Sequence, residues 1–251
     1  MRSITSSTTL SLLAFAACAT PHGAVHEVDY ATLVAAPDRT DADRALDPGR
    51  HPVEMLAFLD VRPGMRVADL AAGGGYTTEL LARAVTPGGV VYGQNSALML
   101  RFAGEAWAAR LARPAMAAVV RGDREFEDPL PPDARELDLV VMNAAYHDLV
   151  AMKVDRPRMD RAVFQALRKG GAFVVVDSSA RPGSGVSDSP TLHRIDEQVV
   201  KDEVLGAGFR LAAEGDFLRN PNDPRDWNAS PRAAGERRGT SDRFALRFEK
   251  P

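Results

Sequence analysis

Between residues 51 and 177, short apolar runs alternate with longer stretches in which apolar positions recur at helical spacing. The apolar runs predict strands, at residues 65–70, 90–93, 115–121, 137–143 and 172–177. The helically spaced stretches predict helices, at residues 51–60, 76–85, 97–111 and 159–168. Strands that are apolar almost throughout and alternate with helices are typical of a parallel sheet buried on both faces. The pattern therefore predicts an α/β fold with a doubly wound, Rossmann-like sheet.

The last third of the chain has a different pattern. A helix predicted at 191–206 leads into a strand at 209–218, a loop rich in Pro, Asn and Asp, and a final strand at 243–248. Because no helix separates these two strands, we expect them to form an antiparallel hairpin at the edge of the sheet. The sequence shows no internal repeat and no clear second domain.

Composition and charge narrow the class of protein. The chain has 251 residues, with 31 Lys and Arg against 34 Asp and Glu, so its formal net charge is -3. The length suffices for a full core, and the mild negative charge argues against a protein that binds nucleic acid by neutralising phosphates. The single cysteine, Cys18, excludes an internal disulfide and a zinc cluster built from cysteines. No apolar run reaches the length of a membrane-spanning helix.

The first twenty residues resemble a secretory signal. Arg2 supplies a positive start, and a short apolar stretch at 10–17 is followed by small residues. Residues 15–18 (Phe-Ala-Ala-Cys) resemble the lipobox of bacterial lipoproteins, in which the cysteine becomes lipidated after cleavage. The resemblance implies lipidation of Cys18; the alternative is an uncleaved N-terminus with an incidental cysteine.

This interpretation divides the chain into three parts. We expect a signal peptide at 1–18 with cleavage before Cys18, a tether at 19–40 and a folded domain at 41–251. The protein would then be lipid-anchored on the periplasmic side of the cell envelope. Ala19, which follows the cysteine where inner-membrane lipoproteins carry Asp, favours the outer membrane. If the signal is not used, the protein stays in the cytoplasm.

A glycine-rich turn between a predicted strand and a predicted helix indicates a ligand site. The strand ends near Asp69, and the turn reads Ala-Ala-Gly-Gly-Gly at 71–75. A carboxylate at this place would repel the pyrophosphate of a dinucleotide and would stabilise a cationic ligand. S-adenosylmethionine carries an ammonium and a sulfonium group and no phosphate. The electrostatics therefore favour S-adenosylmethionine as the cofactor.

Residues 67–75 resemble the first motif of class I S-adenosylmethionine-dependent methyltransferases. The resemblance continues in order along residues 50–250, at 122–123, 138–143 and 167–171. Three shorter segments resemble a narrower family of bacterial methyltransferases of undefined substrate, namely 73–76, 146–148 and 191–196. This resemblance implies a seven-stranded, mostly parallel sheet with a reversed terminal strand.

The resemblance also implies a cofactor site. It assigns cofactor contacts to eight residues, which are Asp69, Ala71, Gly73, Gly75, Gln94, Asn95, Asp123 and Asn143. Asp69, Gly73 and Gly75 would hold the methionine part, Gln94 or Asn95 the ribose, and Asp123 the adenine amino group. Two features depart from the family pattern: Ala71 replaces its first glycine, and amides replace its ribose-binding acid. Because an amide bonds a hydroxyl without charge assistance, we expect weaker cofactor binding.

Chemistry is expected in the loop after the fourth strand, because ligands of open α/β sheets lie beyond the carboxyl ends of the strands. This loop carries Asn143, Tyr146, His147 and Asp148. His147 has an ordinary pKa suited to taking a proton from a methyl acceptor. Asp148 is a candidate for substrate binding or, equally, for capping the next helix. Asn143 and Tyr146 also resemble the ends of the Asn-Pro-Pro-Tyr signature of amino-group methyltransferases, although both prolines are absent.

A second polar loop follows the fifth strand. His193 is a second candidate for the catalytic base, or it forms an ordinary polar pair with Asp196. Arg181 and Arg194 are candidates for binding substrate, or for pairing with acids. His147, His193 and nearby carboxylates are also candidates for a metal site, but their spacing fits no known metal-ligand pattern, so we expect no metal.

Two hypotheses of different kinds follow. The first is an S-adenosylmethionine-dependent methyltransferase that acts on a small molecule. The second is a lipid-anchored binding protein with the same fold and no turnover, since the cofactor is made in the cytoplasm and an exported enzyme would need a supply. Both imply a small-molecule partner, no nucleic acid, and contact with a membrane through the lipid anchor only. The sequence leaves the oligomeric state open.

Overall fold

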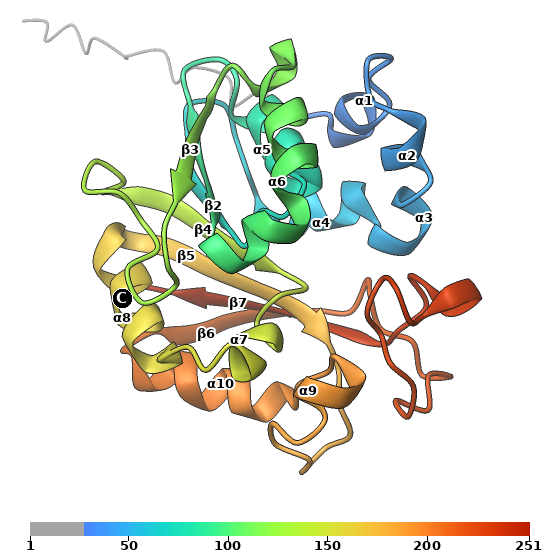
Figure 1. The fold of residues 1–251 in the computed structure, drawn as a ribbon. Helices are drawn as coiled ribbons and strands as arrows, with labels where there is room; N and C mark the ends of the chain where they lie inside the picture. Colours follow the sequence, from blue (N-terminus) through green and yellow to red (C-terminus); the bar gives the residue numbers. More distant parts are fainter. Residues whose placement is uncertain (1–27) are drawn as a thin grey trace, which may run out of the picture.

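The computed structural model describes residues 28–251, so the predicted signal peptide, its Cys18 and the tether up to residue 27 lie outside the described residues. A seven-stranded sheet with helices on both faces forms the centre of the molecule (Figure 1). The strands lie in the order β3-β2-β1-β4-β5-β7-β6. Their bounds are β1 Arg66–Leu70, β2 Val90–Asn95, β3 Val119–Asp123, β4 Leu137–Asn143, β5 Leu167–Ser178, β6 Arg210–Gly215 and β7 Arg243–Glu249.

The direction of the strands confirms the predicted fold class. β1 to β5 are parallel, and β7 lies antiparallel between β5 and β6. The predicted closing hairpin is therefore present, with β6 at the edge of the sheet. The strand order reverses between β1 and β4, and the crevice at such a reversal is where ligands bind in open α/β sheets.

Each face of the sheet has its own apolar core. Leu139 and Val141 of β4 point into a core with α4 and α5, whereas the alternate residues Val140 and Met142 point into a core with α8 and α10. The pleat of a strand sends successive side chains to opposite faces, which explains why the strand is apolar almost throughout. Figure 1 shows the two helical layers on either side of the sheet. The α-helices are α1 Tyr30–Val34, α2 Asp41–Arg44, α3 Asp47–Arg50, α4 Pro52–Leu59, α5 Tyr76–Val85, α6 Ala97–Leu111, α7 Asp148–Ala151, α8 Arg156–Ala166, α9 Ser189–Leu192 and α10 Glu197–Gly206.

The predicted helix at 191–206 is two helices. His193 has φ 51°, a left-handed conformation that ends α9, and α10 begins after the cap residue Asp196. Between them, Ile195 forms a parallel bridge with Ser179. The predicted third strand at 115–121 also begins later, because residues 114–116 form a 3-10 turn that starts at a proline.

The predicted tether is wrong from residue 28 onwards. The Tyr30 hydroxyl donates to the carbonyl of Val61 at 2.9 Å. Leu33 and Val34 of α1 pack against the apolar core that α4 and α5 form with the sheet. These residues therefore belong to the folded domain, which the sequence placed at 41–251. Within residues 28–251, no helix combines the length and the apolarity that crossing a membrane requires.

Candidate active site

The glycine turn after β1 is tightly packed. Ala71, Gly73 and Gly75 have φ of 59°, 57° and 83°, so the chain reverses here through left-handed conformations. A Cβ atom built on Gly75 would lie 2.7 Å from the indole ring of Trp107, on α6. Glycine is therefore required at this position, while Ala71 adopts a conformation that an L-residue rarely takes.

Asp69 lies at the end of β1, below this turn. Its side chain is 1% exposed, and its Oδ2 accepts a hydrogen bond from the Thr78 hydroxyl at 2.6 Å. Burial raises the pKa of Asp69 to about 7, although Thr78 and the more distant Arg50 favour the charged form. Because this pKa is close to neutral, a cation placed next to the carboxyl would cause it to lose its proton and become charged.

Gln94 and Asn95, the predicted ribose ligands, bind the glycine turn. The Ala71 amide donates to Gln94 Oε1 at 2.9 Å, and the Gly73 amide donates to Asn95 Oδ1 at 2.8 Å. Asn95 Nδ2 donates back to the Gly73 carbonyl at 3.1 Å, and Gln94 Nε2 donates to the carbonyl of Arg124 at 2.5 Å. An amide can satisfy both the N–H and the carbonyl of one residue, which a carboxylate cannot. These bonds explain why amides occupy the end of β2.

The other two predicted cofactor residues lie at the ends of neighbouring strands. Asp123, at the end of β3, is exposed and pairs with the Arg121 guanidinium, with Nε 2.9 Å from its carboxylate. Asn143, at the end of β4, is half-buried and donates from Nδ2 to the Thr77 hydroxyl on α5 at 3.3 Å. Asn143 thus faces the first turn of the helix that the glycine turn opens.

Arg50, the last residue of α3, lies beside the helix that the glycine turn opens. Its guanidinium lies 4.2 Å from the ring centre of Tyr76, on the first turn of α5. Burial lowers the pKa of Arg50. Within residues 28–251 no carboxylate forms an ion pair with it. It is a half-buried cation close to Asp69 and to the glycine turn.

His147 is held firmly by Asp177, the penultimate residue of β5. Asp177 Oδ2 accepts from the backbone N–H of His147 at 2.8 Å, and its Oδ1 lies 2.7 Å from His147 Nδ1. Burial opposes protonation of this ring, but Asp177 and Asp148 outweigh it and raise the pKa of His147 to about 10. One carboxylate therefore fixes both the backbone and the ring of His147.

The free edge of His147 meets both His193 and Asp148. His147 Nε2 lies 3.2 Å from His193 Nδ1 and 3.2 Å from Asp148 Oδ1, and the last two atoms are also 3.2 Å apart. The two imidazole rings are nearly perpendicular, with an interplanar angle of 78°. The two candidate bases thus form one cluster with Asp148. The alternative pair of His193 with Asp196 is absent, since Asp196 caps α10 and accepts from the Gly183 amide at 2.7 Å.

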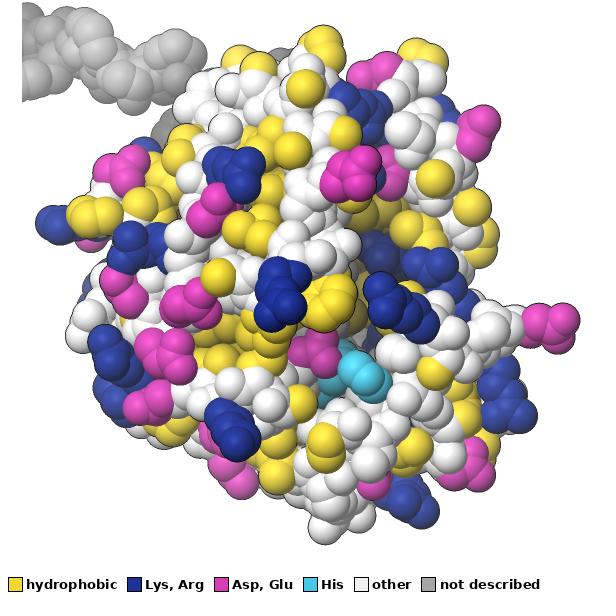
Figure 2. Space-filling model, in the orientation of Figure 1, with side chains coloured by type: hydrophobic (Ala, Val, Ile, Leu, Met, Phe, Trp, Pro, Cys, Tyr) yellow, Lys and Arg dark blue, Asp and Glu magenta, His cyan; other side chains and the backbone are white. Residues whose placement is uncertain are grey.

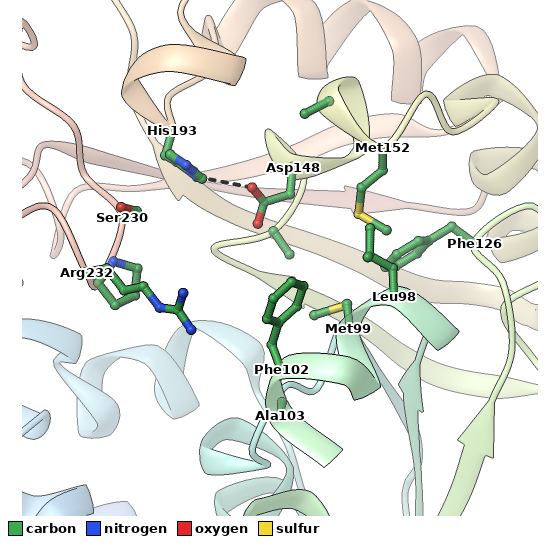
Figure 3. A pocket seen from close by; sticks show the side chains of 13 residues that line it. Leu98, Met99, Phe102, Ala103, Phe126, Asp148, Met152, His193, Ser230 and Arg232 are labelled. Carbon is green, nitrogen blue, oxygen red and sulfur yellow. Dashed lines mark ion pairs between the residues drawn. The ribbon is translucent and has the colours of Figure 1, made fainter. Parts of the chain in front are cut away.

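This cluster borders a cavity of about 530 Å³ (Figure 3). Apolar side chains from α6 and from the loops after β3 and α7 line one side, and Asp148, His193 and Arg232 line the other. Phe102, 71% exposed, stands at the mouth near the Arg232 guanidinium. Figure 2 shows a histidine (cyan) exposed beside an acidic side chain, next to apolar side chains. The size is ordinary for a small-molecule site. The apolar lining residues are Leu98, Met99, Phe102, Ala103, Phe126, Ala145, Ala151, Met152 and Pro231.

The structure contradicts the assignment of Tyr146. The side chain is fully buried on the far side of the loop, with its hydroxyl 3.0 Å from Asp160 Oδ2 and 2.9 Å from Glu203 Oε2. The ring therefore joins α8 to α10 and cannot stack on a substrate in the cavity. The resemblance of Asn143 and Tyr146 to an amine-binding signature is wrong in its geometry.

Neither predicted substrate arginine lines the cavity. Arg194 has no exposed surface; it donates to Asp223 at 2.8 Å and to the carbonyl of Ser179 at 3.0 Å. It is a structural ion pair that joins the segment after α9 to the loop before β7. Arg181 is exposed and lies 3.8 Å from Asp188, outside the cavity.

Two residues that matter to the site were not predicted. Asp177 could have been found from the sequence, because it ends the fifth apolar run and so lies at the carboxyl edge of the sheet. Arg232 comes from the long loop between β6 and β7, and nothing in its local pattern indicates a site. The predicted cofactor residues around Asp69 and the His147 cluster occupy the same edge of the sheet, but none of the predicted cofactor residues lines the cavity beside the cluster.

Comparison with known proteins supports the fold. No family model matches the chain. A 38-residue stretch is 58% identical to the protein-L-isoaspartate O-methyltransferase of Aeropyrum pernix, and it covers 15% of each chain. A SAM-dependent methyltransferase from Aquifex aeolicus superposes with a TM-score of 0.58 at 15% identity, over 90% of this chain and 100% of the other.

A second solved structure gives the same result. The SAM-dependent O-methyltransferase of Thermotoga maritima superposes with a TM-score of 0.50 at 19% identity, over 78% of this chain and 63% of that one. At these identities the likeness concerns the path of the chain. The seven-stranded sheet with its reversed strand is thus the fold of class I methyltransferases.

Proposed function

We propose that the chain is an S-adenosylmethionine-dependent methyltransferase that acts on a small-molecule acceptor. The observation that carries this proposal is the surrounding of Asp69. Its carboxyl is buried at the end of β1, next to a glycine turn at the point where the strand order reverses. A buried acid whose pKa is raised toward neutrality favours a cationic ligand and disfavours a phosphate. The motif resemblance and the fold agree with this electrostatic argument.

The charges around the glycine turn suit the amino-acid end of the cofactor. Its ammonium group would lie toward Asp69, and its carboxylate toward the Arg50 guanidinium, which no carboxylate of residues 28–251 pairs. Asn143 at the end of β4 would contact the same end. Binding of the ribose would require Asn95 to release Gly73, with the loss of two hydrogen bonds. We therefore expect affinity below that of a site with a free carboxylate at this position.

The cavity would hold the rest of the reactants. Leu98, Met99 and Phe126 offer an apolar surface to an aromatic base, and the cluster at the opposite end faces the acceptor. Because Asp177 and Asp148 favour a proton on His147, His193 is the side chain available to take one from the acceptor. Methyl transfer otherwise requires alignment of the acceptor with the sulfonium group.

Thermal denaturation with added ligand tests the proposal. S-adenosylhomocysteine at millimolar concentration should raise the melting temperature of the full chain, since a ligand that binds only the folded state stabilises it. Asp69→Ala should abolish the rise, whereas Asp133→Ala, which removes an acid on the amino-terminal side of the sheet, should retain it. A wild-type chain that shows no rise would contradict the proposal and favour a binding protein without turnover.

We also propose that Cys18 is lipidated and anchors the protein to the cell envelope. The support is the sequence of residues 15–18 and the position of the chain's single cysteine after a short apolar stretch. Labelling of cells with a radioactive fatty acid should tag the wild type and not the Cys18→Ser variant. Equal labelling of both proteins, or of neither, would refute the anchor.

A further inference from the structure

Three side chains at one end of the cavity bring metal-ligating atoms together. His147 Nε2, His193 Nδ1 and Asp148 Oδ1 form a triangle with sides of 3.2 Å, and two of these side chains line the cavity. Of the groups of His, Cys, Asp and Glu within residues 28–251, this is the set whose donor atoms converge in this way. The spacing of 147, 148 and 193 along the chain gave no indication of it, because the two histidines follow different strands.

The triangle has the dimensions of a ligand set. Bonds of about 2.1 Å to nitrogen and oxygen, at angles between octahedral and tetrahedral values, separate neighbouring donors by about 3.0 to 3.4 Å. An ion placed above the three atoms would be within bonding distance of each one. The imidazole rings are nearly perpendicular, with an interplanar angle of 78°, so both can approach one ion without overlapping.

Asp177 supplies the support that such a site requires. Its Oδ1 accepts from Nδ1 of His147, which leaves Nε2 as the nitrogen that can bind an ion. The same carboxylate holds the backbone N–H of His147, so the ring has little freedom to turn. A carboxylate behind a ligating histidine is the usual second contact of a protein-bound metal. The backbone of His193 is held in a left-handed conformation that turns its ring toward the cluster.

We propose that His147, His193 and Asp148 bind one divalent transition-metal ion. Two imidazoles and one carboxylate suit Fe²⁺, Zn²⁺, Mn²⁺ or Co²⁺, whereas Mg²⁺ and Ca²⁺ prefer oxygen alone. The three protein ligands occupy one side of the ion, and its remaining positions face the cavity, since Asp148 and His193 form part of the wall. Under the proposed methyltransferase function, on which this last step rests, the acceptor would be a molecule that binds the ion through an oxygen or nitrogen atom near the atom to be methylated. The bound ion would replace the proton on His147 and occupy the lone pair of His193, and by lowering the pKa of the bound acceptor it would take over the role given above to His193 as base.

Titration of the metal-free full chain with Co²⁺ tests the site directly. Calorimetry should detect one Co²⁺ per chain, displaceable by Zn²⁺, and visible absorption should show the bands of a nitrogen- and oxygen-ligated ion. His193→Gly should weaken binding by at least about 10-fold to 100-fold, as expected for loss of a ligand. Glycine suits the positive φ of this position, so the backbone is not strained by the change.

A matched control separates ligation from the change of residue. His51 also has a positive φ, of 46°, and lies outside the cluster, so His51→Gly should bind Co²⁺ as the wild type does. Asp148→Asn, which keeps the shape of the side chain, provides a second variant should His193→Gly fail to fold, and it should also bind more weakly. No Co²⁺ bound by the wild type, or equal binding by the wild type and both ligand variants, would overturn the proposal.

The metal site and the methyltransferase function can be refuted independently of each other. Asp69→Ala should lose the thermal response to S-adenosylhomocysteine and still bind Co²⁺. A wild-type chain that responds to S-adenosylhomocysteine and binds no metal would refute the metal site alone. A chain that binds metal and shows no response to S-adenosylhomocysteine would support the metal site and contradict the methyltransferase.

Discussion

Asp69 would couple binding of the proposed cofactor to pH. The carboxyl is desolvated, so the folded protein holds its proton to a pH of about 7, whereas the unfolded chain loses it near the ordinary value of 3.8. Without ligand, the charged form therefore opposes folding, and this contribution lowers the free energy of unfolding as the pH rises from 3.8 to about 7. A cationic ligand reverses the preference, because it favours the charged carboxylate.

We expect the affinity for S-adenosylhomocysteine to increase as the pH rises through about 7. The physical reason is that Asp69 must be ionised to attract the ammonium group of the ligand. Calorimetric titration on both sides of this pH measures the effect. Asp69→Asn should bind more weakly and with a flatter pH profile, and comparison of the two proteins cancels the ionisation of the ligand itself. Parallel profiles for both proteins would contradict the role of Asp69.

Asn95 illustrates a residue whose role cannot be read from a family pattern. Its amide binds both the N–H and the carbonyl of Gly73, so its type follows from the backbone of the turn. The sequence shows that the usual ribose-binding acid is absent at this position. It does not show that the side chain of Asn95 binds the backbone of Gly73. The same holds for Arg194, whose partner Asp223 lies 29 residues further along the chain.

Asn95→Asp should therefore have two opposite effects. The carboxylate would face the Gly73 carbonyl, and the lost hydrogen bond should lower the free energy of unfolding by about 1 to 3 kcal/mol. The same carboxylate would be free to accept from the ribose hydroxyls, so cofactor affinity should rise. Denaturant melts and ligand titrations measure the two quantities. Weaker binding in the variant would show that the ribose lies elsewhere.

At the scale of elements, long periodic segments were predicted well and breaks in them were not. α5, α6 and β4 have the predicted bounds, because each has one dominant pattern and clear stop signals at its ends. The helix predicted at 191–206 contains a left-handed residue, His193, that apolar periodicity does not reveal. That break brings His193 to His147, so the missed feature is also the one that assembles the cluster.

The link between α8 and α10 gives a prediction at this scale. Tyr146 shares its hydroxyl between Asp160 and Glu203, and burial raises the pKa of Asp160 to about 7. Tyr146→Phe should lower the free energy of unfolding by about 1 to 3 kcal/mol, since the buried Asp160 loses its hydrogen bond with this hydroxyl, whereas the half-buried Glu203 keeps two bonds from Arg156. The response to S-adenosylhomocysteine and the binding of Co²⁺ should be unchanged, because the ring does not reach the cavity. A loss of ligand binding without a loss of stability would contradict this and would indicate that Tyr146 contacts a ligand.

At the scale of the whole molecule, ion pairs tie the first helices to the methyltransferase fold. Glu79 of α5 is 2% exposed and accepts from Arg110 at 2.6 Å and from Arg83 at 2.9 Å. Arg110 also pairs with Asp43 of α2 at 2.7 Å and donates to the carbonyl of Gly74, in the glycine turn, at 2.6 Å. The segment that the sequence suggested as a tether thus leads into helices that contact the glycine turn through one arginine. Local patterns cannot reveal such contacts, because the partners are far apart in the chain.

Glu79→Gln should be strongly destabilising. Three half-buried guanidinium groups, of Arg83, Arg110 and Arg113, would lose the buried carboxylate that they share, although Asp38 and Asp43 still pair with the first two. Loss of hydrogen bonds to a charged group costs about 1.5 to 3 kcal/mol. Denaturant unfolding measures the loss. Glu105→Gln on the exposed face of α6 is the control, and it should change the free energy of unfolding by no more than about 0.5 kcal/mol. Equal stability of both variants would show that these contacts contribute little.

The packing of Trp107 has a practical consequence. The indole ring lies against Gly75 of the glycine turn. A Cβ atom on Gly93 would also lie 2.7 Å from the ring, so the ring packs against both the turn and β2. A ligand that breaks the hydrogen bonds between Asn95 and Gly73 would therefore change the surroundings of the ring. Since the chain has 2 tryptophans, replacing Trp227 by Phe would leave a single intrinsic fluorophore there. Its emission would report in real time whether the turn opens before the ligand arrives or only afterwards.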